Sequence, residues 1–297
     1  MNKSLVFFGT EAISATSLQA LIDNDWVIEA VITKPDSPRG RHGTPTAPLV
    51  KTIALEHNIR VLQPQKVSEI TSEHFESTAA VLVSYGKIIP PSVIDLFPID
   101  IVNVHPSLLP KYRGPTPFQT AILNGETATG VSLMKLVEAM DAGPIYAQTS
   151  YPLRGTETAE TLGQQLAVIG ASMLVEKLPQ IIDESLAPIP QDDTQATYCH
   201  LFTKDMGMID WNKSAEVIER EIRAYHEWPK STATLGKQTV IVRKAHVTEE
   251  DGEPGSWRIE GNELIVFTGN EALVIDELQP PGKTPMSAAS FLSGNQL

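Results

Sequence analysis

The sequence predicts an α/β domain built on a parallel sheet, followed by a smaller antiparallel β unit. Two observations in the first half support the parallel sheet: short apolar runs without polar alternation, and helical patterns that separate them. Strands that are buried on both faces have this pattern, because helices cover the sheet on either side. We expect strands at residues 4–8, 27–33, 59–62, 79–84 and 101–104, with helices between them that include residues 14–22 and 48–56.

The first predicted strand ends at Gly9-Thr10, where a nucleotide-binding turn would begin. A dinucleotide fingerprint needs two further glycines, and this chain has Ala12 and Ser14 nearby instead. We interpret the region as a Rossmann-like start without a nucleotide cofactor, or simply as a tight turn from strand to helix.

A long helical pattern runs from Thr158 to Glu184, and Pro179 is expected to kink or end it. Its apolar residues form one stripe, as in a core helix: Leu162, Leu166, Ile169, Met173, Leu174, Leu178 and Ile181. A polar segment with two prolines follows. We therefore predict a first domain at residues 1–184, a linker at 185–206 and a second domain at 207–297.

The second domain is predicted to contain one helix and several short strands separated by Gly or Asn turns. The helix is expected at residues 214–225, and the strands at 239–247, 255–259, 263–268 and 271–278. Short strands that follow one another in this way indicate an antiparallel β unit.

Composition narrows the class of protein. The chain has 297 residues, of which 41% are hydrophobic and 20% charged, as is ordinary for a globular protein. Its first residues form too short an apolar run for a signal peptide, and no apolar run approaches ~20 residues, so we expect a cytoplasmic protein that does not use a membrane. One cysteine, Cys199, excludes an intrachain disulfide, and the spacing of the histidines predicts no metal site.

Asn103, His105 and Asp141 are the candidate catalytic residues. Asn103 and His105 are two residues apart at a strand end, so their side chains are expected on one face. When an amine attacks a carbonyl, an amide can donate to the oxyanion, an imidazole can move the proton and a carboxylate can orient that imidazole. Taken alone, however, Asn-x-His also fits a turn with a structural histidine. Residues 107–117, with three prolines, predict a rigid loop beside the candidates.

Several motifs, in order, resemble the enzymes that transfer a formyl group from 10-formyltetrahydrofolate. They are Asn103-x-His105, Ser107-Leu108-Leu109-Pro110, Tyr112-Arg113-Gly114 and Asp141. The longer stretch of residues 107–145 is most similar to the methionyl-tRNA formyltransferases, and the similarity extends over nearly the whole chain. The resemblance implies transfer of the formyl group to the free amino group of methionyl initiator tRNA, without a metal. It also implies that the second domain is a small OB-like β-barrel.

The resemblance also places the folate. The residues expected near the pterin are Tyr85, Gly86, Lys87, Ile88, Ile89, Ser107, Leu108, Leu109, Pro110, Met140, Ala142 and Gly143. A pterin is flat and rich in donors and acceptors, so backbone groups of apolar loops suit it. Alternatively, residues 84–90 only close a strand.

Charge argues against strong binding of nucleic acid. The net charge is −13, whereas binding to phosphates normally requires a positive surface. The expected tRNA contacts are therefore local: Arg39 and Arg41 in the loop at residues 34–46, and Lys213, Arg220, Lys230 and Lys244 in the second domain. In the related enzymes this loop is richer in lysine. Interleaved acidic residues leave open a solvated surface of mixed charge instead.

Three other functions share some of these features. An amino-sugar or purine-pathway formyltransferase would use the same three catalytic residues, and a formyltetrahydrofolate hydrolase would replace the amine by water. A non-catalytic RNA-binding protein would not need Asn103, His105 and Asp141 together. The Ile209-Asp210-Trp211 and Trp228-Pro229 motifs resemble the tRNA enzymes and favour the tRNA acceptor.

Overall fold

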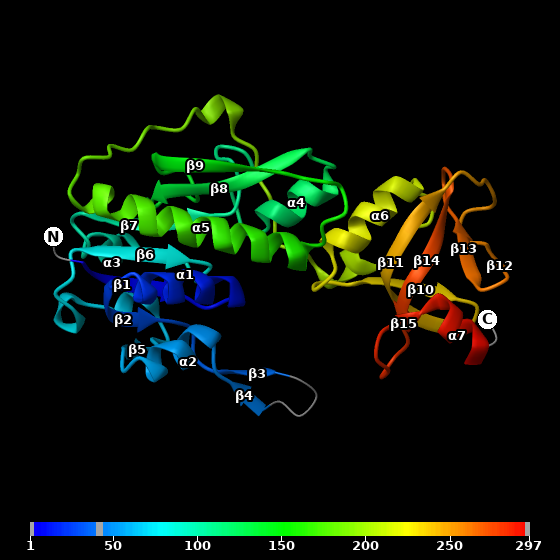
Figure 1. Ribbon diagram of the computed structural model, residues 1–297, viewed down its shortest axis with the longest axis horizontal. Helices are drawn as coiled ribbons and strands as arrows, with labels where there is room; N and C mark the ends of the chain where they lie inside the picture. The colour runs from blue at the N-terminus through cyan, green and yellow to red at the C-terminus, as the bar shows by residue number, and fades with distance from the viewer. Residues whose placement is uncertain (1–2, 40–43, 295–297) are drawn as a thin grey trace. The chain divides into compact units, whose positions relative to one another are not determined.

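A computed structural model describes residues 3–39 and 44–294, and the chain divides into two compact units (Figure 1). Unit 1 comprises Met1–Gly114, Thr129–Pro152 and Gly163–Tyr198, and unit 2 comprises Pro115–Ala128, Leu153–Leu162 and Cys199–Leu297. Each unit thus draws on segments that are distant in sequence. The domain limits expected at residues 184 and 207 describe the order along the chain and stay a prediction.

Unit 1 contains a seven-stranded sheet of order β5-β2-β1-β6-β7-β8-β9. The five predicted strands are confirmed and pair in parallel: β1 (Ser4–Gly9), β2 (Val27–Ile32), β5 (Arg60–Leu62), β6 (Ala79–Val83) and β7 (Asp100–His105). Two strands were not predicted. β8 (Ala128–Lys135) pairs antiparallel with β7, and β9 (Ile145–Pro152) follows at the edge. The sheet is therefore mixed, and the half-exposed, polar β9 lacks the apolar signal of the buried strands.

The predicted helices of unit 1 are confirmed as α1 (Ala12–Asp23), α2 (Leu49–Glu56) and α5 (Ala159–Ile182). The expected stripe of α5 is buried apart from half-buried Ile169. The helix does not end at Pro179, because buried Leu178 and Ile181 hold its last turn against the core. Short helices complete this part of the chain: α3 (Pro91–Ile94), α4 (Pro117–Leu123, in unit 2), and the 3₁₀ helices η1 (Val67–Glu69), η2 (Ser72–His74) and η3 (Asp193–Gln195).

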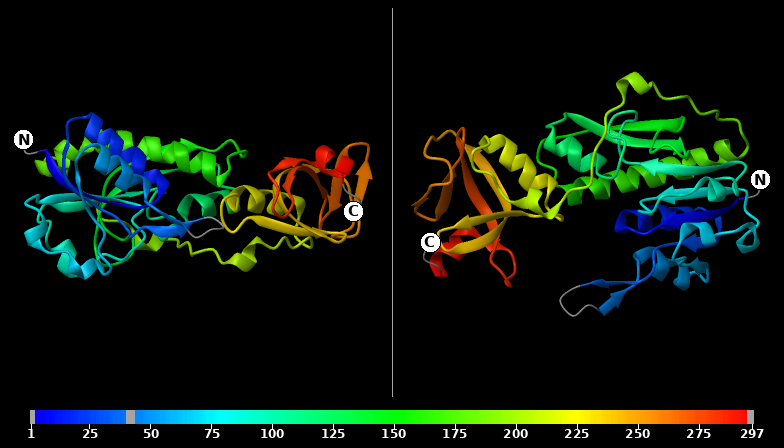
Figure 2. Two further views of the ribbon diagram at one scale, coloured as in Figure 1. Left: turned by 90° about the horizontal axis from the view of Figure 1, so that it is seen from below. Right: turned by 180° about the vertical axis from the view of Figure 1, so that it is seen from behind.

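Different elements pack on the two faces of the sheet in unit 1 (Figures 1 and 2). Helix α5 packs closely on β7, since a Cβ on Gly170 would lie 2.7 Å from Cγ1 of Val104. Asn103 and His105 are one residue out of phase with Val104, so their side chains lie on the opposite face. On that face Phe8 and Ile101 belong to a buried apolar cluster. The candidate catalytic side chains therefore extend from the face that α5 does not cover.

Two short strands of the segment at residues 34–46 pair as an antiparallel hairpin. Its strands are β3 (Ser37–Arg39) and β4 (Thr44–Thr46). Before the hairpin, Asp36 accepts hydrogen bonds from Gln63 at 2.8 Å and from Lys51 at 2.9 Å, which lower the pKa of its carboxyl. Arg41 lies outside the described residues.

Unit 2 contains a six-stranded antiparallel sheet, and the pattern of short strands predicted this antiparallel β unit. The sheet order is β10-β11-β14-β13-β12, with β15 on β14. The elements are η4 (Lys204–Gly207), α6 (Ala215–Ala224), β10 (Ser231–Leu235), β11 (Gln238–Thr248), β12 (Trp257–Glu260), β13 (Glu263–Phe267), β14 (Ala272–Gln279), β15 (Met286–Ser287) and α7 (Ala288–Gly294). Ile218 and Ile222 of α6 are buried in the core of this sheet. β10, β15 and α7 were not predicted.

Helix α5 is long and apolar enough to cross a membrane by those two criteria alone. A core helix passes the same test, and the apolar stripe of α5 is largely buried inside the protein. We therefore interpret α5 as a core helix.

Candidate active site

The three residues predicted to be catalytic lie together in unit 1. Asn103 Nδ2 donates to Oδ1 of Asp141 at 3.4 Å, and Nδ1 of His105 lies 3.7 Å from the same oxygen. Asn103 and His105 are buried, whereas the Asp141 side chain is 15% exposed. One carboxylate oxygen is thus the common point of the amide and the imidazole, with limited access to solvent.

The other nitrogen of His105 determines the state of the ring. Nε2 lies 2.9 Å from the carbonyl oxygen of Tyr112, which can only accept, so Nε2 carries the proton and donates. In a neutral imidazole, Nδ1 then presents a lone pair to the Asp141 carboxylate. A direct hydrogen bond between them needs a second proton on the ring. The gap of 3.7 Å therefore suits a group that brings an N–H or O–H, such as an attacking amine.

The backbone of this region holds Asp141 in an unusual conformation. Asp141 has a φ of 48°, in the left-handed region that non-glycine residues rarely adopt. Its Oδ2 accepts from the Gly114 N–H at 2.8 Å, and Gly114 itself has a φ of 121°. This arrangement uses Oδ2 for positioning and leaves Oδ1 toward Asn103 and His105. The strained residue thus stands where the amide and the imidazole converge.

The loop at residues 107–110 directly follows β7 and is held rigid by buried polar contacts. Ser132 Oγ donates to the Ser107 carbonyl at 2.6 Å and accepts from the Leu109 N–H at 3.1 Å. Gln148 Nε2 donates to the Leu109 carbonyl at 2.8 Å, and the carbonyl of Pro110 accepts from Thr197 N–H at 3.2 Å. The rigidity predicted from the prolines thus has a second cause in side chains of β8 and β9.

The loop at residues 85–89 follows β6, the parallel neighbour of β7, so both loops leave the same edge of the sheet. The Tyr85 ring lies in the core, edge-to-face with Phe8 at 5.6 Å, and burial raises the pKa of Tyr85 to about 12. Tyr85 can therefore reach a ligand only through its backbone. Lys87 Nζ donates to the carbonyls of residues 64 and 65, and Ile88 is 83% exposed.

The third predicted folate segment surrounds Asp141. Met140 is exposed, Ala142 is half-buried and Gly143 is buried. A Cβ on Gly143 would lie 1.8 Å from the Lys135 carbonyl oxygen, so only glycine fits there. Among the described residues, no group of three or more His, Cys, Asp or Glu side chains is arranged to hold a metal.

Gln191 is a polar residue at this site that the sequence analysis missed. Its Nε2 donates to the carbonyls of Asp141 at 2.8 Å and Gly143 at 2.7 Å. It lies in the segment predicted as a linker, and a single glutamine beside Pro190 carries no pattern that would have identified it. Only contacts across about 50 residues of chain reveal it.

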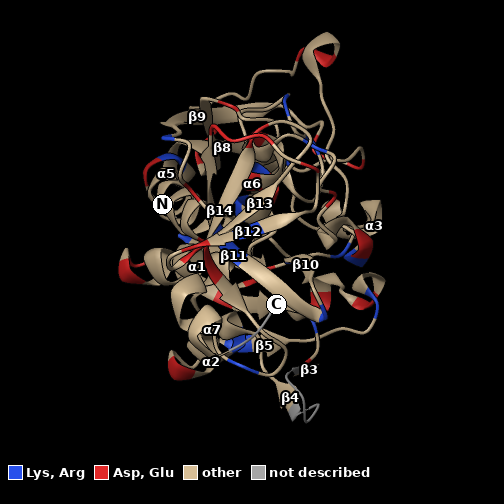
Figure 3. Ribbon diagram, turned by 90° about the vertical axis from the view of Figure 1, so that its right-hand side faces the viewer, with Lys and Arg blue, Asp and Glu red and all other residues tan. Residues whose placement is uncertain are grey.

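The basic residues predicted to bind tRNA in unit 2 differ in their surroundings. Lys213 Nζ forms an ion pair with Glu221 at 2.5 Å, and Arg220 Nε donates to the Leu123 carbonyl at 3.1 Å. Lys244 is exposed and Lys230 is half-buried. Figure 3 shows acidic positions among the basic ones. Lys213 and Arg220 therefore already have structural partners, whereas Lys244 faces solvent.

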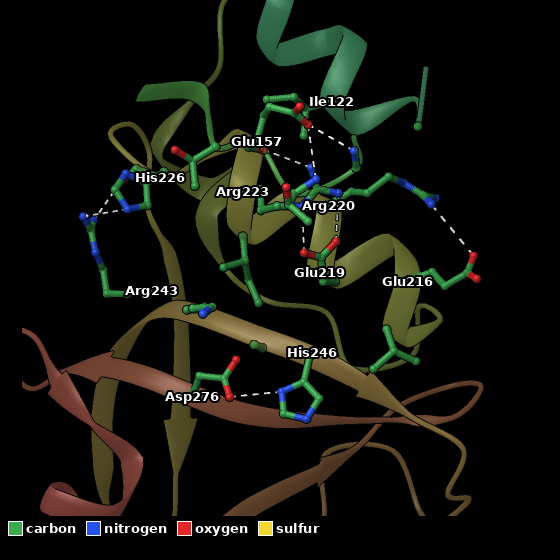
Figure 4. A pocket seen from close by; sticks show the side chains of 18 of the residues that line it. Ile122, Glu157, Glu216, Glu219, Arg220, Arg223, His226, Arg243, His246 and Asp276 are labelled. Atoms are coloured by element: carbon green, nitrogen blue, oxygen red, sulfur yellow. Dashed lines mark hydrogen bonds and ion pairs between the residues drawn. The ribbon is translucent and has the colours of Figure 1, made fainter. Parts of the chain in front are cut away.

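Arg220 and Lys244 line a cavity of about 840 Å³ within unit 2, between α6, β11 and the segments at residues 122–126 and 153–158 (Figure 4). Arg223 binds Glu219 through two hydrogen bonds of 2.7 and 2.9 Å and also donates to the Glu157 carbonyl at 3.0 Å. Basic and acidic side chains on the cavity wall thus largely form ion pairs with one another.

His226, at another wall of the cavity, is held in its neutral form. Arg243 Nη2 lies 3.0 Å from His226 Nε2, and because a guanidinium only donates, that nitrogen must accept. Burial lowers the pKa of His226 and the positive charge of Arg243 lowers it further, while Glu160, with Oε2 3.5 Å from Nδ1, opposes them.

Comparisons with known proteins match both halves of the chain. Residues 2–178 match the formyl transferase family and residues 202–296 match the formyl transferase C-terminal domain. A methionyl-tRNA formyltransferase of Geobacillus sp. (strain WCH70) is 40% identical over 98% of this chain and 94% of the relative. One of Myxococcus xanthus (strain DK1622) is 39% identical over 99% of this chain and 95% of the relative.

Solved structures share the fold at low sequence identity. The N-formyltransferase of Helicobacter canadensis, in complex with folinic acid and dTDP-3-aminofucose, has a TM-score of 0.68 at 21% identity over 94% of this chain and 99% of that one. The methionyl-tRNA formyltransferase of Clostridium thermocellum has a TM-score of 0.55 at 16% identity, covering 92% and 98%. At these identities the likeness concerns the fold alone.

Proposed function

We propose, on the premise that this chain belongs to the formyl transferase family, that it transfers a formyl group from 10-formyltetrahydrofolate to the free amino group of methionyl initiator tRNA. The observation that carries the proposal is the match to methionyl-tRNA formyltransferases at about 40% identity over nearly the full length of both chains. The convergence of Asn103, His105 and Asp141 supplies the chemistry that this transfer needs.

The reaction exchanges one C–N bond for another. The methionyl amine attacks the formyl carbon, and the carbonyl oxygen becomes an oxyanion in the tetrahedral intermediate. The bond from the formyl carbon to N10 of the folate then breaks, N10 takes up a proton and the new amide has lost one. The protein therefore has to stabilise one negative charge and move one proton.

Each of the three side chains can fill one of these needs. The Asn103 amide donates to Asp141 over a long 3.4 Å contact, so it can turn to the developing oxyanion at little cost. His105, anchored through Nε2, presents Nδ1 to the attacking amine as a base. Asp141 stabilises the imidazolium that results, because its Oδ1 lies 3.7 Å from Nδ1.

The folate and the tRNA are assigned to different parts of the chain. The donor is proposed to bind at the loops that leave the sheet edge after β6 and β7 and at the turn beside Asp141, chiefly through backbone groups. Residues 1–184 are proposed as the catalytic domain and 207–297 as the tRNA-binding, OB-like domain, with residues 185–206 between them. The reaction is proposed to take place in the cytoplasm, where translation occurs.

An acceptor competition tests the proposal. Purified protein is incubated with 10-formyltetrahydrofolate and either methionine-charged initiator tRNA or a nucleotide-linked amino sugar, with uncharged tRNA as the control. We expect formyl-methionyl-tRNA alone. Formylation of the sugar would replace the proposed acceptor, and folate release without an acceptor would indicate a hydrolase.

A further inference from the structure

Gln191 connects the segment after α5 to the loop that carries Asp141. We propose that Gln191, supported by Arg113, is a positioning residue that sets the Asp141 carboxylate for formyl transfer. This inference rests on the proposed function of the same site. It assigns a chemical role to a segment whose sequence predicts only a linker.

The amide of Gln191 bonds the Asp141 turn at two points. Nε2 donates both of its hydrogens, one to the Asp141 carbonyl at 2.8 Å and one to the Gly143 carbonyl at 2.7 Å. These two carbonyls bracket Ala142, so one side chain spans the turn. Because Asp141 has a φ of 48°, the turn needs such contacts to persist.

Arg113 fixes which way the Gln191 amide points. Gln191 Oε1 accepts from Arg113 Nε at 3.0 Å and from Nη2 at 2.8 Å. A guanidinium has no acceptor, so the oxygen must face Arg113 and the NH₂ must face the turn. Arg113 is 3% exposed and its Nη2 also donates to Asp193 at 2.7 Å, which anchors the fork in one geometry.

The contacts form a closed ring around Asp141. Gly114, the residue after Arg113, donates its N–H to Asp141 Oδ2 at 2.8 Å. The side chain of Asp141 is therefore bound to Gly114, and the main chain of Asp141 is bound through Gln191 to Arg113. One rigid segment holds both ends of the residue. Oδ1 is left at the position that faces Asn103 and His105.

Glutamine can both donate to the two carbonyls of the turn and accept from Arg113. Glutamate has the same shape and accepts from Arg113, but its carboxylate cannot donate to the two carbonyls. A Gln191→Glu variant therefore keeps an acceptor for buried Arg113, and it turns both contacts with the turn from attractive to repulsive. Gln191→Ala removes both. Gln195, an exposed glutamine four residues further on, provides a matched control in Gln195→Ala.

The test compares the three full-length variants with the wild-type protein. Formylation of charged initiator tRNA should show kcat lowered by about tenfold to a hundredfold in Gln191→Glu and Gln191→Ala, with both KM values and the thermal midpoint of Gln191→Glu near wild type. Gln195→Ala should match wild type. A Gln191→Glu enzyme with wild-type kcat, or one whose loss lies only in KM, would overturn the proposal.

A second readout needs no substrate. The hydrogen exchange of the Gly114 backbone amide, which donates to Asp141 Oδ2 at 2.8 Å, is measured by NMR in wild type, Gln191→Ala and Gln195→Ala. If Gln191 holds the turn, its loss should speed the exchange of this amide, whereas Gln195→Ala should leave it unchanged. Unchanged exchange in Gln191→Ala would contradict the positioning role. If exchange is faster in Gln191→Ala but the wild-type protein formylates no tRNA, the positioning role stands and the proposed function fails.

Discussion

The Asp141 site in unit 1 and the cavity in unit 2 both gather charged and polar side chains, but they use them differently. At Asp141, Oδ2 is bound to the backbone while Oδ1 faces Asn103 and His105 over 3.4 and 3.7 Å, distances too long for strong hydrogen bonds. In the cavity, Arg223 and Glu219 form a bidentate pair at 2.7 and 2.9 Å. Short, satisfied contacts stabilise structure, whereas long contacts around a fixed group leave room for a substrate. The contrast separates the candidate active site from a structural cluster.

The largest effect should follow from removing the reacting groups themselves. His105→Ala and Asp141→Asn should each lower single-turnover formylation on the order of a hundredfold or more, because each removes a base or the charge that supports it. Circular dichroism should show an intact fold. If either purified variant formylates at a near wild-type rate, the Asp141 site does not carry the reaction, and the chemistry has been assigned to the wrong unit.

Arg41 should affect the reaction more than the binding. It lies outside the described residues, in the loop at residues 34–46 where contacts with tRNA are predicted. Arg41→Ala should reduce the single-turnover rate at saturating charged tRNA about tenfold and change Kd less. A variant that binds tRNA far more weakly but reacts normally once saturated would assign Arg41 to binding alone.

Basic residues of unit 2 should contribute to affinity according to their exposure. Lys244→Glu should weaken tRNA binding and flatten its dependence on salt by about one unit of slope per lost phosphate contact. Lys213, already paired with Glu221 at 2.5 Å, should change affinity less when replaced by Gln. Filter binding across a salt series distinguishes them. Equal effects would show that the ion pair opens when RNA binds.

The smallest effect concerns the stability of the cavity at acidic pH. Burial and Arg243 lower the pKa of His226 in the folded protein, so the unfolded chain takes up this proton first as the pH falls below about 6.5. The stability contribution is complete above that pH and is lost below it. Glu160, Glu227 and Glu277 partly offset the shift. His226→Gln should reduce the fall in thermal midpoint between pH 7 and 5.5 by about 1–2 °C. If the thermal midpoint of His226→Gln falls as far as that of wild type, protonation of His226 does not cause the loss of stability.

Parts of the fold were predictable because their signals are local. The five parallel strands are apolar without alternation since both faces are covered, and the two-residue spacing of Asn103 and His105 places them on one face. β9 was missed because its residues are half-exposed and polar. Pro179 does not end α5, because buried contacts at Leu178 and Ile181 outweigh its local effect, and the helix runs to Ile182, close to the predicted limit at Glu184.

In the candidate site, too, the sequence predicts some features, and others depend on packing. Asp141 could be included from the resemblance, but no local rule predicts that its φ is positive or that Gly114 donates to it. Tyr85 is predicted near the pterin, but no local rule predicts that its ring lies against Phe8 in the core and leaves only its backbone for a ligand. Arg220 is predicted to contact tRNA, but the sequence does not show that its Nε also donates to the backbone carbonyl of Leu123. Each of these depends on what packs nearby, which a list of residue types does not contain.

By itself, the sequence determined the type and order of the main elements, the face that carries Asn103 and His105, and the family. Periodicity, spacing and motif order record these properties along the chain. Only the tertiary structure decided which oxygen of Asp141 faces His105, and that Gln191 and Arg113 hold the turn between them. Those contacts join residues about 50 and 78 positions apart, and their geometry exists only after the chain has folded.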